Sequence, residues 1–200
     1  MTIRMHSRLE QSLVNGPGSR AVIWLQGCSL NCPGCWNPLS HSIEAGIAVE
    51  VFSVVEWVAD LKSNRLIDGL TISGGEPMEQ AGALLALVQA LRLRVPEISI
   101  GLFSGYTESE LVRGAFLSHD GHLPSHQADL WRAIRQHLDF AVLGRFNRHR
   151  PTHQPLVTSP NQALLLLTDR HSASDFSSLS VEFTIDSQGT TQITGFPILQ

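Results

Sequence analysis

The sequence contains only three cysteines, and all of them lie in one short stretch. They are Cys28, Cys32 and Cys35, so no cysteine is left to join distant parts of the chain. A fold stabilised by a disulfide framework is therefore excluded. Free thiols that lie so close together are typical of metal binding, and they persist in a reducing compartment. We therefore expect a cytoplasmic protein.

Charged residues are also scarce, at 16% of the chain, and the net charge is -4. This acidic balance provides no basic surface for nucleic acid, so we expect no nucleic-acid partner. No apolar run reaches the ~18 residues that a membrane-spanning helix needs, and residues 1–10 are too polar for a secretory signal. The 200 residues suffice for one domain with a sizeable core.

The three cysteines follow the spacing C-x3-C-x2-C, directly after Gly27. A structural zinc site needs four ligands, and an ordinary iron–sulfur cluster needs four cysteines. Three thiolates can hold three corners of a cubane cluster and leave the fourth iron open, as catalytic sites do. Two alternatives remain: a zinc knuckle with His41 as the fourth ligand, and three cysteines without a common role.

Strands and helices alternate along most of the chain, which predicts βαβ units and a parallel sheet. The expected strands cover residues 20–26, 68–73, 97–103, 139–143 and 161–168. We predict an α/β fold, an open partial (β/α) barrel with about five or six parallel strands. A β-hairpin is expected over residues 181–194, added to an edge of the main sheet. We assign residues 1–170 to the barrel and residues 171–200 to a linker and the hairpin, packed on the same domain.

Helix signals separate these strands. Ser53 with Glu56, and Thr107 with Glu110, have the spacing of capping boxes and predict helices that end near residues 63 and 117. Apolar helices are expected over residues 79–94, where Pro96 ends the helix, and over residues 128–138. Residues 118–127 contain three histidines, His119, His122 and His126. Glycine and proline argue against a helix there, so we expect a solvated loop rather than a second metal site.

The second motif is Ser73-Gly74-Gly75-Glu76-Pro77, at the end of the strand predicted over residues 68–73. Two glycines allow the backbone to approach a ligand closely, and exposed amides with a carboxylate could hold an ammonium group. Considered alone, this motif is also what a plain strand-to-helix turn looks like. Its position one βα unit after the cysteine loop favours a shared ligand site, at the carboxyl ends of the strands.

Together the two motifs resemble the radical S-adenosylmethionine (SAM) superfamily. The resemblance is strongest to the activating proteins of anaerobic ribonucleoside-triphosphate reductase, a branch of the glycyl radical enzyme activating enzymes. It extends over residues 10–168. The matching residues are Asn15-Gly16-Pro17-Gly18 with Arg20, Gly27-Cys28, Cys32-Pro33-Gly34-Cys35 with Asn37, Ser73-Gly74-Gly75, Ser104-Gly105-Tyr106, Gly144-Arg145-Phe146, and Ser159 with Asn161-Gln162.

The resemblance implies roles for particular residues. Cys28, Cys32 and Cys35 would bind a [4Fe-4S] cluster whose open iron chelates SAM. Gly34, Cys35 and Trp36 would lie along SAM, with the aromatic ring near adenine. Gly74, Gly75 and Glu76 would hold its amino group. Ser104 and Arg145 are assigned to SAM as well, Arg145 because a guanidinium can pair with the SAM carboxylate.

The resemblance also implies a radical reaction. An external donor such as flavodoxin or ferredoxin would reduce the cluster, and SAM would be cleaved to methionine and a 5′-deoxyadenosyl radical. The expected hydrogen donor is a glycine of a partner glycyl radical enzyme. Alternatives are a peptide, a nucleoside or another small molecule, and a non-catalytic Fe–S or zinc-binding redox module. Three features depart from the branch. Leu143 stands where an acid is usual, residues 118–127 resemble an insertion, and roughly thirty residues follow Asp169.

Overall fold

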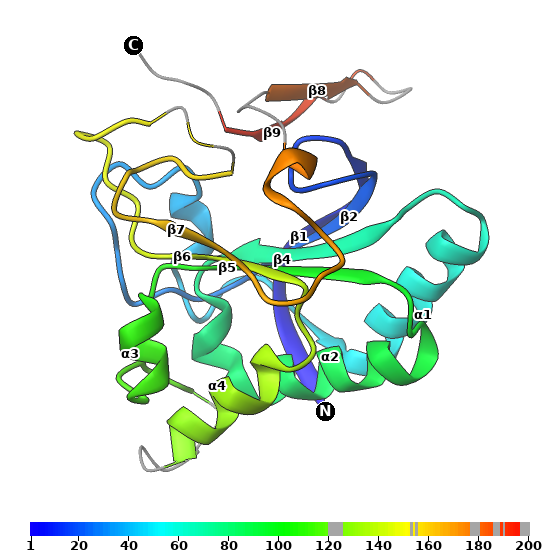
Figure 1. Cartoon of the computed structure of the whole chain (residues 1–200), viewed down its shortest axis with the longest axis horizontal. Helices are drawn as coiled ribbons and strands as arrows, with labels where there is room; N and C mark the ends of the chain where they lie inside the picture. Colours follow the sequence, from blue (N-terminus) through cyan, green and yellow to red (C-terminus); the bar gives the residue numbers. More distant parts are fainter. Residues whose placement is uncertain are drawn as a thin grey trace.

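In the computed structural model of the protein, the described residues are 1–119, 126–152, 154, 156–176, 181–185, 189 and 191–196. They form a seven-stranded sheet in the order β3-β1-β2-β4-β5-β6-β7 and a separate two-stranded sheet, β8-β9 (Figure 1). The strands of the large sheet are β1 (Thr2–Ser12), β2 (Arg20–Leu25), β3 (Ile47–Glu50), β4 (Gly69–Gly74), β5 (Ser99–Ser104), β6 (Phe140–Leu143) and β7 (Ala163–Leu166).

The centre of this sheet is parallel. Strand β2 pairs in parallel with β4, β4 with β5, and β5 with β6. The outer strands β1, β3 and β7 pair antiparallel with their neighbours. The predicted α/β class is confirmed, but the prediction of five or six parallel strands is wrong, because the described residues contain four. The closure of the sheet into a partial barrel stays a prediction.

The prediction failed at both edges of the sheet for identifiable reasons. No helix lies in the described part of the chain between β6 and β7, so the chain returns antiparallel rather than through a crossover. Strands β1 and β3 were not expected at all. Strand β1 is largely polar and β3 has only four residues, most of them exposed, so neither produces a strong strand signal.

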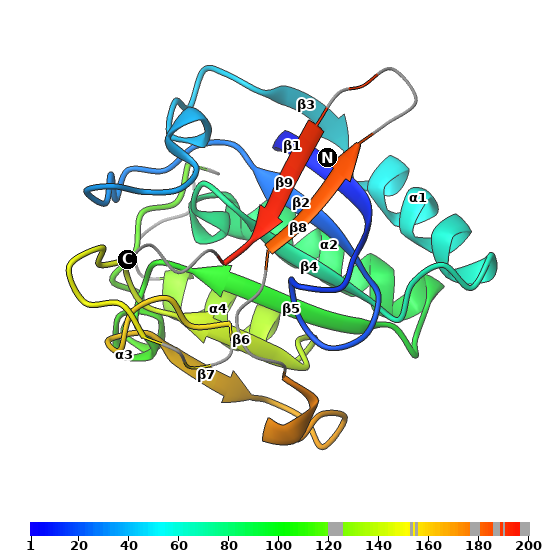
Figure 2. The ribbon, with the colours of Figure 1, turned by 90° about the horizontal axis from the view of Figure 1, so that it is seen from above.

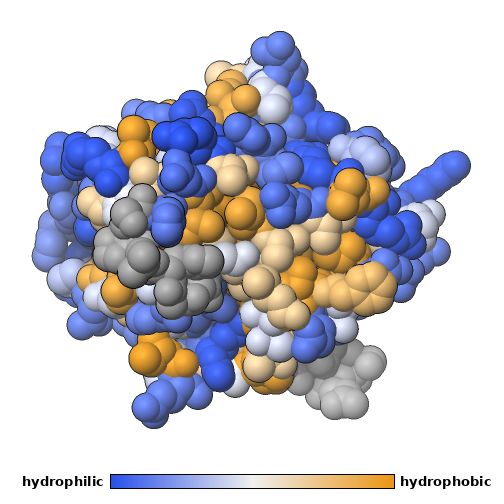
Figure 3. All heavy atoms as spheres, turned by 90° about the horizontal axis from the view of Figure 1, so that it is seen from below, coloured by the Kyte–Doolittle hydropathy of each residue, from blue (hydrophilic) through white to orange (hydrophobic). Residues whose placement is uncertain are grey.

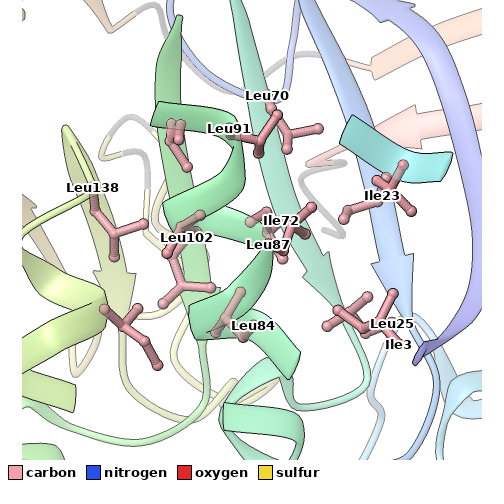
Figure 4. Close-up of a cluster of buried hydrophobic side chains, with 14 of the residues drawn as sticks. Ile3, Ile23, Leu25, Leu70, Ile72, Leu84, Leu87, Leu91, Leu102 and Leu138 are labelled. Carbon is pink, nitrogen blue, oxygen red and sulfur yellow. The ribbon is translucent and has the colours of Figure 1, made fainter. Parts of the chain in front are cut away.

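The α-helices of the described residues cover one face of the sheet (Figure 1). They are α1 (Val51–Ser63), α2 (Ala81–Arg94), α3 (Glu108–Val112) and α4 (Gln127–Arg135). Leu84, Leu87 and Leu91 of α2 point at the strands and form the middle of the main core (Figure 4). Figure 3 shows the outer side of this helical layer, where hydrophobic residues gather across the middle and hydrophilic residues lie mostly around them.

Two helix boundaries differ from the prediction. The expected capping box of Ser53 is wrong, because α1 starts at Val51 with Glu50 as its N-cap. Strand β3 runs directly into the helix and leaves no turn for a cap at Ser53. The capping box of Thr107 and Glu110 is present. Helix α3 nevertheless ends at Val112 rather than near residue 117, since Gly114 has a positive φ of 67°.

The opposite face of the sheet carries the hairpin of β8 (Val181–Ile185) and β9 (Thr191–Gly195), seen from above in Figure 2. The hairpin was correctly predicted. Its expected attachment to an edge of the main sheet is wrong, because it forms a sheet of its own above the strands. A second apolar cluster lies on this face, formed by Phe140, Val142, Leu156, Val157 and Phe176 with Phe103, Leu164 and Phe196 packed against it.

Among the described residues, no helix is both long and apolar enough to cross a membrane.

Candidate metal and cofactor site

The cysteine loop begins where β2 ends, at the carboxyl end of the parallel strands. Backbone conformations with positive φ at Gly27 (100°), Asn31 (45°) and Gly34 (74°) bend it into a compact turn. Its first residues are tied to the returning chain, because Gly27 N donates to Ser40 O at 2.8 Å and Cys28 N donates to His41 O at 3.0 Å. The loop is therefore positioned by backbone hydrogen bonds to the chain that follows it.

The three cysteines are partly buried, unpaired thiols that line one cavity of about 160 Å³. Burial raises the pKa of Cys28 to about 11. The pKa of Cys32 is raised as well, mainly by burial and to a smaller extent by the nearby Cys35. The apo site therefore favours neutral thiols. A bound metal centre would supply the positive charge that converts them to thiolate ligands.

A mononuclear zinc site finds no support in the described residues, where no three His, Cys, Asp or Glu side chains form a group able to hold one ion. His41, the proposed fourth zinc ligand, lines the same cavity. Its Nδ1 lies 3.2 Å from Oδ1 of Asn31, and its Nε2 is buried without a hydrogen-bond partner in the described part of the chain. Three thiols that share a cavity without converging on one point suit a cluster in which each thiolate binds a different iron.

The diglycine corner at the end of β4 is hydrogen-bonded to the start of the cysteine loop. Gly75 N donates to Leu25 O, and Glu76 N donates to Gly27 O, both at 2.8 Å. The packing is so close that a Cβ on Gly75 would lie 2.2 Å from Gly27 O. Gly74 has a φ of 113°, which favours glycine. The structure thus brings together the two motifs that the sequence analysis singled out.

Glu76 is 1% exposed, and both its carboxylate oxygens are occupied. One oxygen accepts from Met78 N at 2.9 Å and from the Ser104 hydroxyl at 2.8 Å. The other accepts from Gly105 N at 2.7 Å. Burial raises the pKa of Glu76 to about 7 in spite of these hydrogen bonds, which act in the opposite direction. Glu76 therefore links the ends of β4 and β5 and lines the cavity.

Trp36 and Ser104, the residues that the resemblance assigns to SAM, also line the cavity. The indole N–H of Trp36 is buried and has no hydrogen-bond partner among the described residues. Its ring lies 5.3 Å from that of Phe146, centroid to centroid. A buried donor without a partner is costly, and a polar ligand in the cavity would satisfy it. The three thiols, the diglycine corner and this free donor fit an iron–sulfur cluster with a polar organic cofactor.

Arg145 does not line this cavity. Its guanidinium donates to Glu110 at 2.8 Å and lies 5.5 Å from the centre of the Tyr106 ring. This bond, with those from Thr107, lowers the pKa of Glu110 to about 2. A contact between Arg145 and SAM stays a prediction, and it requires this ion pair to open. Leu143, the departure from the branch, is 2% exposed and belongs to the main core.

Glu79, which is 1% exposed, also belongs to the site although it was not predicted. Its carboxylate accepts from the backbone N–H of Ser29 at 2.8 Å and from the Ser29 hydroxyl at 2.5 Å. Its second oxygen lies 3.1 Å from Nε2 of His119. Of the three histidines, His119 therefore pairs with a buried acid, His126 is the N-cap of α4, and His122 lies outside the described residues. An acid three residues after Glu76, at the start of an apolar helix, was the only available signal.

Comparisons with known proteins agree with this site. The pattern of the 4Fe-4S single cluster domain family matches residues 14–165. The anaerobic ribonucleoside-triphosphate reductase-activating protein of Vibrio cholerae is 38% identical over 134 residues, which cover 62% of this chain and 86% of that protein. The corresponding protein of Haemophilus influenzae is 33% identical over 60% of this chain and 86% of its own length. The corresponding protein of Enterobacteria phage T4 is 28% identical over 78% of this chain and 89% of its own length.

Among solved structures, QueE from Escherichia coli overlaps 54% of this chain and 54% of its own with a TM-score of 0.45 and 17% identity, too slight a likeness to bear on fold or function. The family pattern, in contrast, spans all three cysteines, the diglycine corner and Ser104. The chain therefore belongs to the 4Fe-4S single cluster domain family, together with the anaerobic ribonucleoside-triphosphate reductase-activating proteins.

Proposed function

We propose that this protein is a radical SAM enzyme that activates a partner glycyl radical enzyme by removing a hydrogen atom from a glycine of that partner. One observation carries the proposal: three free thiols and the corner Gly74-Gly75-Glu76 line a single cavity at the carboxyl ends of parallel strands. A zinc or redox module needs the thiols but has no use for the corner. The named relatives are activating proteins of anaerobic ribonucleoside-triphosphate reductase.

The residues present can hold both cofactors. Cys28, Cys32 and Cys35 would bind the [4Fe-4S] cluster. Trp36, Gly34 and the cavity-lining Ser104 would lie along SAM. When bound and reduced, the cluster with SAM supplies a 5′-deoxyadenosyl radical, the species that removes a hydrogen atom. The protein positions these groups and keeps water away. Glu76 and the backbone of Gly74 and Gly75 would receive the SAM amino group.

The substrate would enter a second cavity of about 540 Å³ on the same face of the sheet. Its wall includes His6, Asn15 and Trp24, and it shares Trp36, Asn37, Ser73, Phe103 and Phe196 with the cofactor cavity. Hydrogen-bonding side chains beside aromatic rings suit the backbone of a peptide loop. The hairpin covers part of this face, so a loop must enter beside it (Figure 2).

We further propose that the electron donor, such as flavodoxin or ferredoxin, binds beside the cysteine loop. Arg148, His149 and Arg150 are exposed, and none of the three forms an ion pair with a described residue. A Cβ built on Gly34 would lie 2.5 Å from Cδ of Arg148, so this basic segment borders the loop. On a chain of net charge -4, a basic patch there would steer an acidic donor protein towards the cluster.

A reduction assay would test this docking site. Replacing Arg148 and Arg150 by alanine should slow reduction by flavodoxin several-fold and flatten its salt dependence, with no effect on reduction by photoreduced deazaflavin. Arg132→Ala, in an exposed ion pair with Asp129, is the control. Equal slowing with both reductants would contradict the proposal. A donor of this kind belongs to the cytoplasm, where we place the protein.

Anaerobic reconstitution tests the function itself. We would load the protein with iron and sulfide, add SAM and dithionite, and measure methionine and 5′-deoxyadenosine by mass spectrometry. Adding the partner glycyl radical enzyme should produce a glycyl radical signal in electron paramagnetic resonance spectra. Cys32→Ala should lose the cluster absorbance and all products. Glu76→Ala should keep the cluster and bind SAM more weakly.

Two results of this experiment would change the assignment. A full cluster without 5′-deoxyadenosine would indicate a non-catalytic iron–sulfur module. Production of 5′-deoxyadenosine without a glycyl radical on the partner would favour a peptide, a nucleoside or another small molecule as the hydrogen donor.

A further inference from the structure

The C-terminal hairpin lies outside the region that defines the family, whose pattern ends at residue 165. The relatives are also shorter, since the match covers 86% of the Vibrio cholerae protein but only 62% of this chain. Yet the hairpin does not extend away from the molecule. It lies above the face of the sheet that carries both cavities, opposite the helices (Figures 1 and 2).

The face that the hairpin turns towards the protein is polar and anchored. Thr194 of β9 is 9% exposed, and its hydroxyl accepts a hydrogen bond from Nδ2 of the buried Asn15 at 2.9 Å. Glu182 of β8 accepts from the backbone N–H of Leu13 at 3.3 Å. The other face is apolar and mostly exposed, since Phe183, Ile185 and Ile193 are 66%, 68% and 60% exposed. Of these three, Ile193 also borders the larger cavity, whereas Phe183 does not.

Immediately after β9, the chain turns into the site. Gly195 has a φ of 106°, which favours glycine and redirects the backbone. The next residue, Phe196, stacks on Phe103 of β5, with ring centroids 5.8 Å apart and planes 21° apart. It also lies 6.3 Å from the ring of Trp36 in the cysteine loop. Phe196 lines both the cofactor cavity and the larger cavity beside it.

We propose that Phe196 is a cofactor-binding residue that this chain has added to the family site. The hairpin delivers Phe196 into the cavity, where Phe103, Trp36 and Phe196 form one aromatic wall for the adenine of SAM. Aromatic rings bind bases by stacking, so the wall increases affinity for SAM and excludes water from the cavity. The inference depends on the proposed function, because it assigns the cavity to SAM.

The test compares two phenylalanines of the same segment. Phe196→Ala should weaken SAM binding to the cluster-loaded protein about tenfold, measured as the Kd by equilibrium dialysis without reductant, because stacking contributes about 1–3 kcal/mol per base. Phe196→Tyr should restore it. The matched control is Phe183→Ala, on the outward face, which should leave the Kd unchanged. Iron and sulfide content should be the same in all variants.

A second variant tests the anchor. Asn15→Ala removes the hydrogen bond to Thr194 and should also weaken SAM binding, by a smaller factor. The proposal is overturned if Phe196→Ala binds SAM normally, or if Phe183→Ala weakens SAM binding as much as Phe196→Ala does. A third outcome would also overturn it: Phe183→Ala alone lowers glycyl radical formation, and no variant changes SAM binding. The hairpin would then be a docking surface for the partner enzyme. If the unaltered protein makes no 5′-deoxyadenosine although Phe196 affects SAM binding, the proposed function fails while the assignment of Phe196 stands.

Discussion

Glu79 holds Ser29, the residue after Cys28, by two hydrogen bonds to one carboxylate oxygen. The bonds come from the backbone N–H at 2.8 Å and from the hydroxyl at 2.5 Å. Glu79 follows the diglycine corner in the 3-10 helix Pro77–Gln80. This 3-10 helix, directly before α2, therefore holds the cysteine loop in place by a contact separate from those of Gly75 and Glu76. We regard Glu79 as a positioning residue for the cluster.

Removing this carboxylate should loosen the cluster. We expect Glu79→Ala to lose its cluster to an iron chelator about tenfold faster, because hydrogen bonds to a charged group contribute about 1.5–3 kcal/mol. Ser29→Ala keeps the backbone donor, so its rate of cluster loss should lie between those of the unaltered protein and Glu79→Ala. The decay of cluster absorbance under anaerobic conditions measures the rate. Glu56→Ala, in an ion pair with Arg94, is the control, and a rate for Glu79→Ala equal to that control would refute the role.

The raised pKa of Glu76 predicts a pH-dependent stability. Its pKa is about 7 in the folded protein and 4.5 ordinarily, so the folded state binds the proton more tightly. The resulting stabilisation is complete below pH 4.5 and is lost as the pH rises through 7, a change of about 3 kcal/mol at most. Urea unfolding of the cluster-free protein at pH 5 and pH 7.5 measures it. Glu76→Gln should remove this part of the pH dependence, and an unchanged dependence would show that Glu76 titrates normally.

The ion pair of Arg145 and Glu110 allows the two roles of Arg145 to be separated. If Arg145 contacts the SAM carboxylate, Arg145→Ala should raise the Kd for SAM, whereas Glu110→Ala should free the guanidinium and leave SAM binding intact or tighter. If Arg145 serves only to hold α3, both variants should lower thermal stability alike and leave the Kd unchanged. Calorimetry of SAM binding and thermal unfolding of the same samples distinguish these cases.

Arg20 is expected to be a structural residue, remote from the cysteine loop. Its buried guanidinium donates five hydrogen bonds, to Thr71, Pro17, Leu70 and both oxygens of Ser99. Arg20→Met should lower the free energy of unfolding by at least about 3 kcal/mol, because each buried acceptor left without a donor costs about 1–3 kcal/mol. Arg20→Lys should not rescue it, because an ammonium has only three donors. Chemical unfolding measures this loss of stability, and Arg132→Met, at an exposed position, is the control. A loss below about 1 kcal/mol for Arg20→Met would contradict the structural role.

Much of the central fold followed from the sequence, because local signals there agree with the tertiary structure. The strands β2, β4, β5 and β6 are short, mostly apolar and buried runs followed by turns. The helix α2 is an apolar run ended by a proline. The edges were harder to predict. Strands β1 and β3 gain their stability by pairing across the sheet, at Ile3 with Val49 for example, and no local pattern encodes such a pairing.

The sequence by itself determined the donor set of the site: three cysteines at a fixed spacing and a diglycine corner one βα unit later. It could do so because both motifs lie at the ends of strands, and parallel strands bring their carboxyl ends to one edge. Only the tertiary structure decided which further side chains reach that edge. Glu79 and Phe196 come from a helix start and a distant hairpin, Arg145 is held away by Glu110, and these placements depend on packing between segments that lie far apart in the sequence.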